Sequence, residues 1–382
     1  MRVGILICCG VCLFPPGALA QTTECGVEDT VCAVDAIPSG GVNMQQIERF
    51  AHQFEAALSL QDWEQVRRLV GQYLSSDDFN PHIGGNIAEE ILNQHPLLDL
   101  ADQVVAKSIE ENTVERLAAL NPDMGNGTRL RREFGRLYGL RARILWKRDR
   151  LSEAADAIEK AMGYAGEAEA GPEDRLLLGL IQYESRMEEV GWHSITQALL
   201  MDTQVENRQP EYQAAMAQIV RKRYGAQADP AAVVADYRDA HLGTVPDLSF
   251  VALDGSRVVL SQLKGKAVLL NFFSPACGTC RQEIGDLRGL HEAFSSEPGL
   301  AFLFVLNRPD LRQEADALLQ RIGLRNPTVL VLERGSVYDL IPAEPCMWIA
   351  DRSGKIVAKH VGYRTGDGVL YRKELAEVIQ DE

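Results

Sequence analysis

The chain has 382 residues, enough for two or three domains, and carries 39 Lys and Arg against 54 Asp and Glu, a net charge of −15. This acidic balance opposes binding to nucleic acid and to anionic membrane surfaces. After residue 20 no apolar run reaches the roughly eighteen residues that a membrane-spanning helix needs.

Residues 1–20 have the features of a secretory signal peptide. Arg2 precedes an apolar stretch at 3–14, and small residues at 18–20 offer a cleavage site. The apolar stretch is too short to span a bilayer. We therefore predict export to the periplasm, an oxidising compartment in which disulfides persist.

The next segment, 21–43, is irregular and contains Cys25 and Cys32. We expect these two cysteines to form a structural disulfide within a loop. An auxiliary redox pair is the alternative.

Residues 44–240 show apolar positions at helical spacing and no useful strand pattern, which predicts an all-helical region. One helix pair is regular, with Ala142 on the first helix and Ala154 and Ala161 on the second. Small residues at these positions let two antiparallel helices approach closely. Their spacing resembles a tetratricopeptide repeat (TPR).

A degenerate second copy of this pattern follows at Gly179, Gly191, Ile195 and Ala198. The region therefore reads as a TPR-like solenoid, in which neighbouring helix pairs stack to bury their apolar faces. Its concave surface would bind a protein partner, or the region would serve only as a helical spacer.

After a linker at 243–246 the composition becomes strand-forming. Asp254-Gly255 indicates a hairpin. We predict a central sheet with helices on both faces. The predicted strands are 248–253, 258–260, 267–273, 300–306, 328–332, 347–350 and 355–358, and the predicted helices follow Cys277 and lie at 311–322 and 369–379.

The motif Cys277-Gly278-Thr279-Cys280 follows the strand 267–273 and begins a helix. This spacing places both sulfurs in the first helical turn, close enough for a disulfide. Unpaired backbone N–H groups and the helix dipole favour the thiolate of the first cysteine, the form that attacks disulfides. The arrangement predicts a dithiol that cycles between reduced and oxidised forms.

Zinc binding is an alternative for the same spacing. A structural zinc site needs four ligands, whereas this half of the sequence adds one cysteine, Cys346, and His291 and His360 fall in no ligand spacing. We therefore expect no metal and no cofactor. A purely structural disulfide is the other alternative, although closing so short a loop stabilises little.

The motifs of this region also occur in a characteristic order: Pro246-Asp247, Leu253-Asp254-Gly255, Leu263-Lys264-Gly265-Lys266, Asn271-Phe272-Phe273, Cys277-Gly278-Thr279-Cys280, Glu283 and Pro345-Cys346-Met347-Trp348. On these motifs residues 246–382 resemble the thioredoxin-like domain of the TlpA/ResA-type thiol–disulfide oxidoreductases. The resemblance implies an α/β thioredoxin-fold domain at 243–382, after the all-α region, and says nothing about 21–242.

The resemblance implies roles for individual residues. Cys277 would be the nucleophile and Cys280 the resolving thiol. Pro345 matches the proline that is cis in thioredoxin folds and faces the disulfide, where the preceding backbone pairs with a substrate strand. Glu344 would then be an acidic neighbour for substrate and would raise the pKa of Cys277.

Asn271 stands where thioredoxin itself has a buried Asp, so the carboxylate that handles protons must lie elsewhere. Glu283, one helical turn after Cys280, is the candidate; an exposed helix carboxylate is the alternative. We expect Cys346 to lie near Cys277 and Cys280. It would be a small buried hydrophobe, a second resolving thiol, or a third ligand for Cu(I).

Together these features predict an exported enzyme that reduces protein disulfides and receives electrons from a membrane thiol–disulfide transporter. The alternatives are an oxidant or isomerase of the same fold, a partner-binding protein, and a Cu(I)-handling protein that uses the fold as a scaffold. Peroxidase chemistry is disfavoured because Leu270 replaces the proline expected before a peroxidatic cysteine.

Overall fold

The computed structural model describes residues 44–77, 79–94, 97–113, 127–165, 170–252, 254–294, 296–306, 308–321, 324, 328–333 and 340–380. The predicted signal peptide and the segment 21–43, with Cys25 and Cys32, lie outside the described residues. No helix in the described ranges is long and apolar enough to cross a membrane. The chain divides into two compact units, 1–165 and 166–382.

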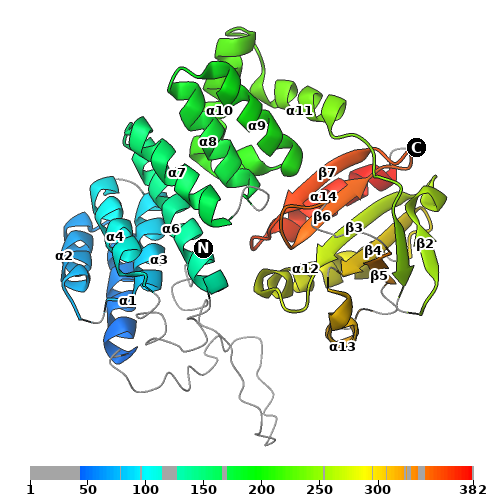
Figure 1. Ribbon diagram of the computed structural model, residues 1–382, viewed down its shortest axis with the longest axis horizontal. Helices are drawn as coiled ribbons and strands as arrows, with labels where there is room; N and C mark the ends of the chain where they lie inside the picture. Colours follow the sequence, from blue (N-terminus) through cyan, green and yellow to red (C-terminus); the bar gives the residue numbers. More distant parts are fainter. Residues whose placement is uncertain are drawn as a thin grey trace, which may run out of the picture. The chain divides into compact units, whose positions relative to one another are not determined.

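All the regular secondary structure in the described residues of the first unit is helical (Figure 1). Apolar residues at helical spacing give these helices a shared core that includes Phe54, Val70 and Ile91. The predicted helical character of this region is confirmed. The helices are α1 (Met44–Ser59), α2 (Trp63–Leu74), α3 (Pro81–Gln94), α4 (Leu98–Glu111), α6 (Gly127–Lys147) and α7 (Leu151–Ala165).

Helices α6 and α7 form a hairpin joined by the short turn at 148–150. Ala142 of α6 and Ala154 and Ala161 of α7 are all buried. Their small side chains let the two helices pack closely, as the sequence predicts. The repeat architecture of a TPR solenoid stays a prediction.

The second unit begins with α8 (Pro172–Glu184), α9 (Glu188–Met201), the short 3-10 helix η2 (Val205–Asn207), α10 (Pro210–Tyr224) and α11 (Pro230–His241). Helices α8 and α9 pack closely against each other where each contributes a glycine, Gly179 and Gly191. A Cβ atom on Gly191 would lie 2.5 Å from the backbone nitrogen of Tyr183, and one on Gly179 would lie 2.7 Å from that of Ile195. Any larger residue would therefore force the two backbones apart.

One seven-stranded sheet follows, in the order β2-β1-β5-β4-β3-β6-β7. The neighbours β3, β4 and β5 run parallel, and the other pairs are antiparallel. Every residue of β3 is buried, as expected for a strand covered on both faces. The predicted strands are confirmed as β1 (Ser249–Ala252), β2 (Arg257–Val259), β3 (Ala267–Phe273), β4 (Leu300–Leu306), β5 (Thr328–Leu332), β6 (Cys346–Ala350) and β7 (Ile356–Val361).

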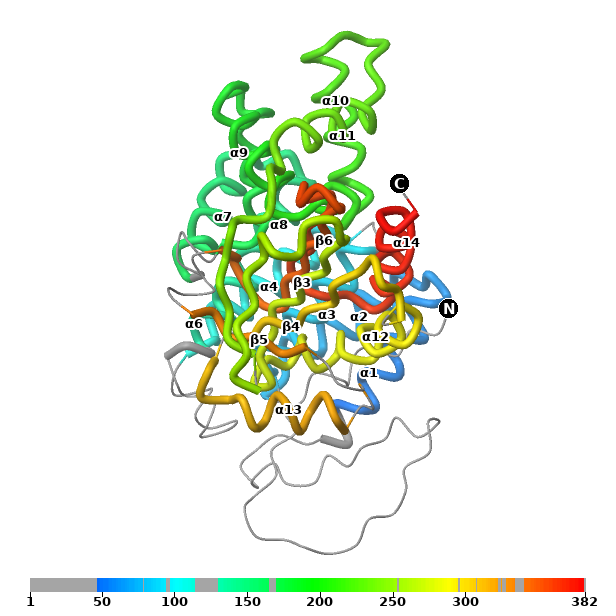
Figure 2. Tube along the Cα trace, turned by 90° about the vertical axis from the view of Figure 1, so that its right-hand side faces the viewer, coloured from blue at the N-terminus to red at the C-terminus, as the bar shows by residue number. Residues whose placement is uncertain are grey.

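One face of the sheet carries α12 (Gly278–Phe294), α13 (Arg312–Arg321) and α14 (Asp367–Gln380), and α12 and α14 lie side by side (Figure 2). Residues of α12 and α13 share one core, as the usual right-handed crossovers from β3 to β4 and from β4 to β5 require.

The opposite face of the sheet packs against Leu242, which follows α11, Leu260 of the 3-10 helix η3 (Leu260–Leu263) and Leu200 of α9. Helical residues thus cover both faces, as predicted. Part of the cover on this second face comes from helices that precede residue 243.

The segment between α9 and η2 also covers the outer edge of β7. The backbone N–H of Thr203 donates to the carbonyl of Lys359 over 2.7 Å, and the N–H of Lys359 donates to Thr203 Oγ1 over 3.2 Å. These bonds satisfy polar groups that an edge strand leaves open. The second compact unit accordingly begins at 166, well before the composition change at 243. Independent folding of 243–382 stays a prediction.

Candidate active site

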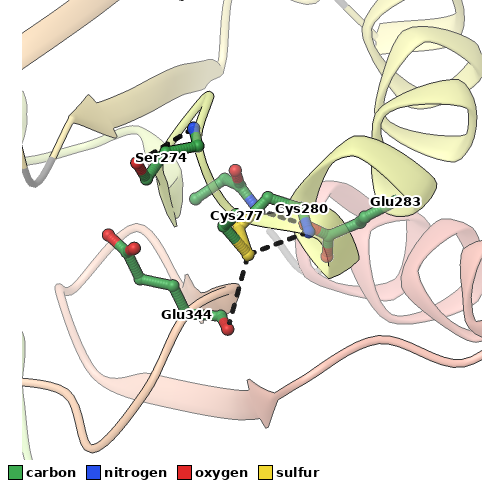
Figure 3. Close-up of a disulfide and its surroundings, with 7 residues drawn as sticks. Ser274, Cys277, Cys280, Glu283 and Glu344 are labelled. Carbon is green, nitrogen blue, oxygen red and sulfur yellow. Dashed lines mark hydrogen bonds between the residues drawn. A yellow bond between two sulfur atoms is a disulfide. The ribbon is translucent and has the colours of Figure 1, made fainter. Parts of the chain in front are cut away.

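The two cysteines of the predicted redox motif lie where β3 meets α12 (Figure 3). After Phe273 the chain turns at Ser274, whose carbonyl accepts from the N–H of Cys277 over 3.0 Å and whose Oγ accepts from the N–H of Ala276 over 3.3 Å. This turn delivers Cys277 to the position just before the first residue of α12.

A disulfide joins Cys277 and Cys280, whose Cα atoms are 5.2 Å apart. The two sulfurs differ in environment, because Cys277 is partly exposed and Cys280 is 2 % exposed. The backbone N–H of Cys280 points to Cys277 Sγ over 3.1 Å. That N–H group and the helix dipole would both stabilise a thiolate at Cys277.

The peptide bond between Glu344 and Pro345 is cis, as the resemblance implies. It brings the backbone carbonyl oxygen of Glu344 to 3.8 Å from Cys277 Sγ. Figure 3 shows that this carbonyl faces the sulfur, whereas the carboxylate of Glu344 points away from it. The backbone of Glu344, and not its charge, is therefore what lies next to the disulfide.

Glu283 is 1 % exposed, so it is a buried acid and not an exposed helix carboxylate. Asn271 Nδ2 donates to Glu283 Oε2 over 3.1 Å. Burial raises the pKa of Glu283 to about 8, and the Asn271 amide and the Tyr371 hydroxyl partly oppose that rise. A carboxyl with such a pKa can take up and release a proton near neutral pH.

Cys346 is buried, at 1 % exposed, and is not disulfide-bonded. Successive residues of a strand point to opposite faces. Met347 and Ile349 of β6 share a core with Cys280, whereas Cys346 lies in the core of the other face with Phe272.

The expectation that the Cys346 thiol lies with Cys277 and Cys280 is therefore corrected: the sheet separates them. Burial raises the pKa of Cys346 far above its ordinary value. This environment suits a small hydrophobe, and it supports neither a second resolving thiol nor a third copper ligand. Within the described ranges no group of three His, Cys, Asp or Glu side chains could hold a metal ion.

Sequence reasoning missed three polar residues on the same side of the sheet as Glu283. They are His360 of β7, and Tyr371 and Glu374 of α14. The sequence presents His360 only as a candidate metal ligand, and its spacing disfavours that role. A stronger signal for a buried position is that His360 follows Ala358 by two residues, in a strand whose alternate residues are buried.

Comparisons with known proteins place the same region in context. A profile of the AhpC/TSA family matches residues 243–359. Thioredoxin-like protein YneN of Bacillus subtilis is 29% identical over 121 residues, which are 31% of this chain and 71% of that protein. Thiol-disulfide oxidoreductase ResA of Halalkalibacterium halodurans is 30% identical over 135 residues, which are 34% of this chain and 72% of that protein.

Among solved structures, a thiol:disulfide interchange protein of the thioredoxin family from Chlorobium tepidum shares 23% sequence identity, with a TM-score of 0.31. The similarity covers 36% of this chain and 96% of that one.

Proposed function

Through its C-terminal region the chain belongs to the ResA-type thiol–disulfide oxidoreductases, and from this premise we propose that it reduces protein disulfides with Cys277 as nucleophile and Cys280 as resolving thiol. One observation carries the proposal. The disulfide lies at the start of α12, with one sulfur partly exposed and the other buried one helical turn before the buried acid Glu283.

The exposure of each sulfur suits its role. In the reduced protein the Cys277 thiolate attacks one sulfur of a substrate disulfide, whose S–S bond breaks. A mixed disulfide forms, and the other substrate sulfur leaves as a thiolate that takes a proton from water. A buried Cys280 cannot meet a protein substrate directly, so it is available for the second step.

In the second step Cys280 gives its proton to the Glu283 carboxylate. Its thiolate attacks Cys277 Sγ, the second substrate sulfur leaves, and the Cys277–Cys280 disulfide forms again. Two electrons have then passed to the substrate. Re-reduction needs a dithiol donor, for which we propose a membrane thiol–disulfide transporter.

Export to the periplasm is also part of the proposal, on the basis of the signal-like sequence 1–20. The helices before the sheet offer surface for a protein partner. Backbone groups of Glu344, beside Cys277 Sγ, would pair with an extended substrate segment.

The midpoint potential of the Cys277/Cys280 couple in the full-length protein tests the proposal. Equilibration with a redox buffer, alkylation and peptide mapping would report this pair separately from the other cysteines. A value near about −270 mV, as in thioredoxin, supports a reductase, whereas a value near about −120 mV identifies an oxidant.

Three cysteine variants test the assignment of the roles. Cys277→Ser should abolish exchange, and Cys280→Ser should accumulate a mixed disulfide with substrate. Cys346→Ser is the matched control and should keep both activity and potential. Exchange that survives Cys277→Ser would refute the proposed site.

A further inference from the structure

A series of polar side chains leads away from Glu283 through the core between the sheet and α14. Its members are Asn271 of β3, Glu283 of α12, Tyr371 and Glu374 of α14, and His360 of β7. Asn271, Tyr371 and His360 are all 0 % exposed. Apolar cores seldom contain so many polar groups, and those they contain are normally hydrogen-bonded.

Three atoms in this series have no hydrogen-bond partner among the described residues. They are Asn271 Oδ1, the Tyr371 hydroxyl oxygen and His360 Nδ1. A buried polar atom without a partner costs stability. Three such atoms around one buried acid therefore call for a functional explanation.

The inner part of the series links Glu283 to Tyr371. The Tyr371 hydroxyl favours the carboxylate form of Glu283 against the effect of burial, although the structure shows no hydrogen bond between the two groups. Removing this hydroxyl would therefore raise the pKa of Glu283 further.

The outer part links Tyr371 to the surface. The ring of Tyr371 packs against that of His360, with centroids 4.8 Å apart. His360 Nε2 lies 2.6 Å from Glu374 Oε2. The side chain of Glu374 is 15% exposed, so the series reaches water at this residue.

We propose that Tyr371, His360 and Glu374 carry protons between Glu283 and solvent during thiol–disulfide exchange. This inference rests on the proposed function, in which Glu283 receives a proton from a cysteine that solvent does not reach. It gives two of the three orphaned atoms, the Tyr371 hydroxyl oxygen and His360 Nδ1, a role as acceptors of a passing proton.

The transfers balance over a full redox cycle. Because the Tyr371 hydroxyl and His360 Nδ1 have no hydrogen-bond partner in the described structure, side-chain movement must first close these two gaps. In the resolving step Glu283 then passes its proton to the Tyr371 oxygen while the Tyr371 hydroxyl proton moves to His360 Nδ1. The proton on His360 Nε2 moves to Glu374 and then to water. When the disulfide is reduced again, a proton moves inward by the reverse steps, which restores the original His360 tautomer. No electron moves along this path.

Other charged groups face the series and are held in place. Asp286 of α12 and Asp367 of α14 both raise the pKa of Glu283. Tyr363 donates to Asp286 over 2.9 Å, and Arg208 pairs with Asp367 over 2.9 Å. Asp202 raises the pKa of Tyr371, and Arg208 lowers it. Variants at Tyr371 and Glu374 leave all of these groups in place.

Two variants of the full-length protein test the inference. Tyr371→Phe removes only a hydroxyl that has no hydrogen-bond partner in the described structure, so the fold should survive. Glu374→Gln places an amide of the same size beside His360, and this amide cannot take up a proton. Tyr183→Phe, at a buried tyrosine of α8, is the matched control.

The measurement is the rate of the resolving step in a single turnover, followed against pH in H₂O and in D₂O. We expect Tyr371→Phe and Glu374→Gln to slow this step at least about tenfold and to increase its solvent isotope effect, with Tyr183→Phe unchanged. Tyr371→Phe should also move the pH midpoint of the rate upward. Imidazole buffer should partly rescue Glu374→Gln, because the lost group lies at the surface.

Wild-type rates in both variants would overturn the inference. So would slowing that only accompanies lost thermal stability, without an isotope effect, a pH shift or rescue. Failure of the proposed function is distinct, since the wild-type protein would then show no exchange at all.

Discussion

Asn271 and Glu283 form a buried hydrogen bond, in which Asn271 Nδ2 donates to Glu283 Oε2 over 3.1 Å. One side chain comes from the strand that leads into the cysteine motif and the other from the helix that follows it. A carboxamide neither gains nor loses a proton in the physiological range. Asn271 therefore positions the acid, and in the proposed mechanism Glu283 provides the proton chemistry.

Replacing Glu283 with Gln should stabilise the protein at alkaline pH. Burial raises the pKa of Glu283 from 4.5 to about 8, so between these values the folded state keeps a proton that the unfolded chain has lost. Stability should therefore fall as pH rises through this window and level off above it. Glutamine does not titrate and removes that slope.

Urea unfolding of the oxidised protein at pH 4.5, 7 and 9 would measure this effect. The exposed Glu377→Gln is the control and should keep the wild-type slope. A wild-type stability that stays flat across the window would show that Glu283 ionises normally in the fold.

Cys346 should matter for stability and not for redox chemistry, because its thiol lies across the sheet from the disulfide. Cys346→Ala leaves a small cavity and should cost about 1 kcal/mol. Cys346→Ser buries a hydroxyl among apolar groups and should cost more, about 1–3 kcal/mol. Denaturant unfolding measures both costs. A change in the midpoint potential of the disulfide in Cys346→Ala would contradict the placement.

The local parts of the site could be predicted from sequence because their determinants are local. A buried strand, a Cys-x-x-Cys turn and a helix are consecutive, and Glu283 follows Cys280 by one turn. The predicted position of Cys346 is wrong, because adjacency to Pro345 suggests proximity to the disulfide, whereas strand alternation turns Cys346 to the opposite core.

The remaining parts depend on tertiary packing. Tyr371, His360 and Glu374 approach Glu283 because β6 and β7 extend the sheet beside β3 and because α14 packs on α12. Likewise, composition marks 243 as a boundary, but the hydrogen bonds of Thr203 to the edge of β7 form only in the folded structure. Neither relationship leaves a periodic signal in the sequence.

The close crossing of α8 and α9 should not tolerate a side chain at Gly191. A Cβ atom there would meet the backbone nitrogen of Tyr183 at 2.5 Å, and backbone cannot move aside as a flexible side chain can. Gly191→Ala should therefore destabilise the protein by about 1–3 kcal/mol. Gly285→Ala is the control, because it lies in α12 with open space around it and should stabilise by about 0.5–1 kcal/mol. Equal thermal midpoints for the two variants would contradict the close packing.

Arg208 should be essential for the stability of the second unit. It follows η2 and pairs with Asp202 over 3.0 Å and with Asp367, in the first turn of α14, over 2.9 Å. The side chain of Arg208 is 6% exposed and that of Asp202 is 1% exposed. Arg208→Ala would leave buried carboxylates uncompensated and should cost about 3–5 kcal/mol.

Arg288→Ala is the matched control for Arg208→Ala, since Arg288 pairs with Glu292 at the surface and such pairs contribute only about 0–1 kcal/mol. Denaturant unfolding of both variants measures the difference. If Arg208→Ala proved as stable as Arg288→Ala, the ion pair between Arg208 and Asp367 would not be what attaches α14 to the helices before residue 243. A large loss in Arg208→Ala alone would instead mean that part of the energy that stabilises the redox domain comes from the helices that precede it.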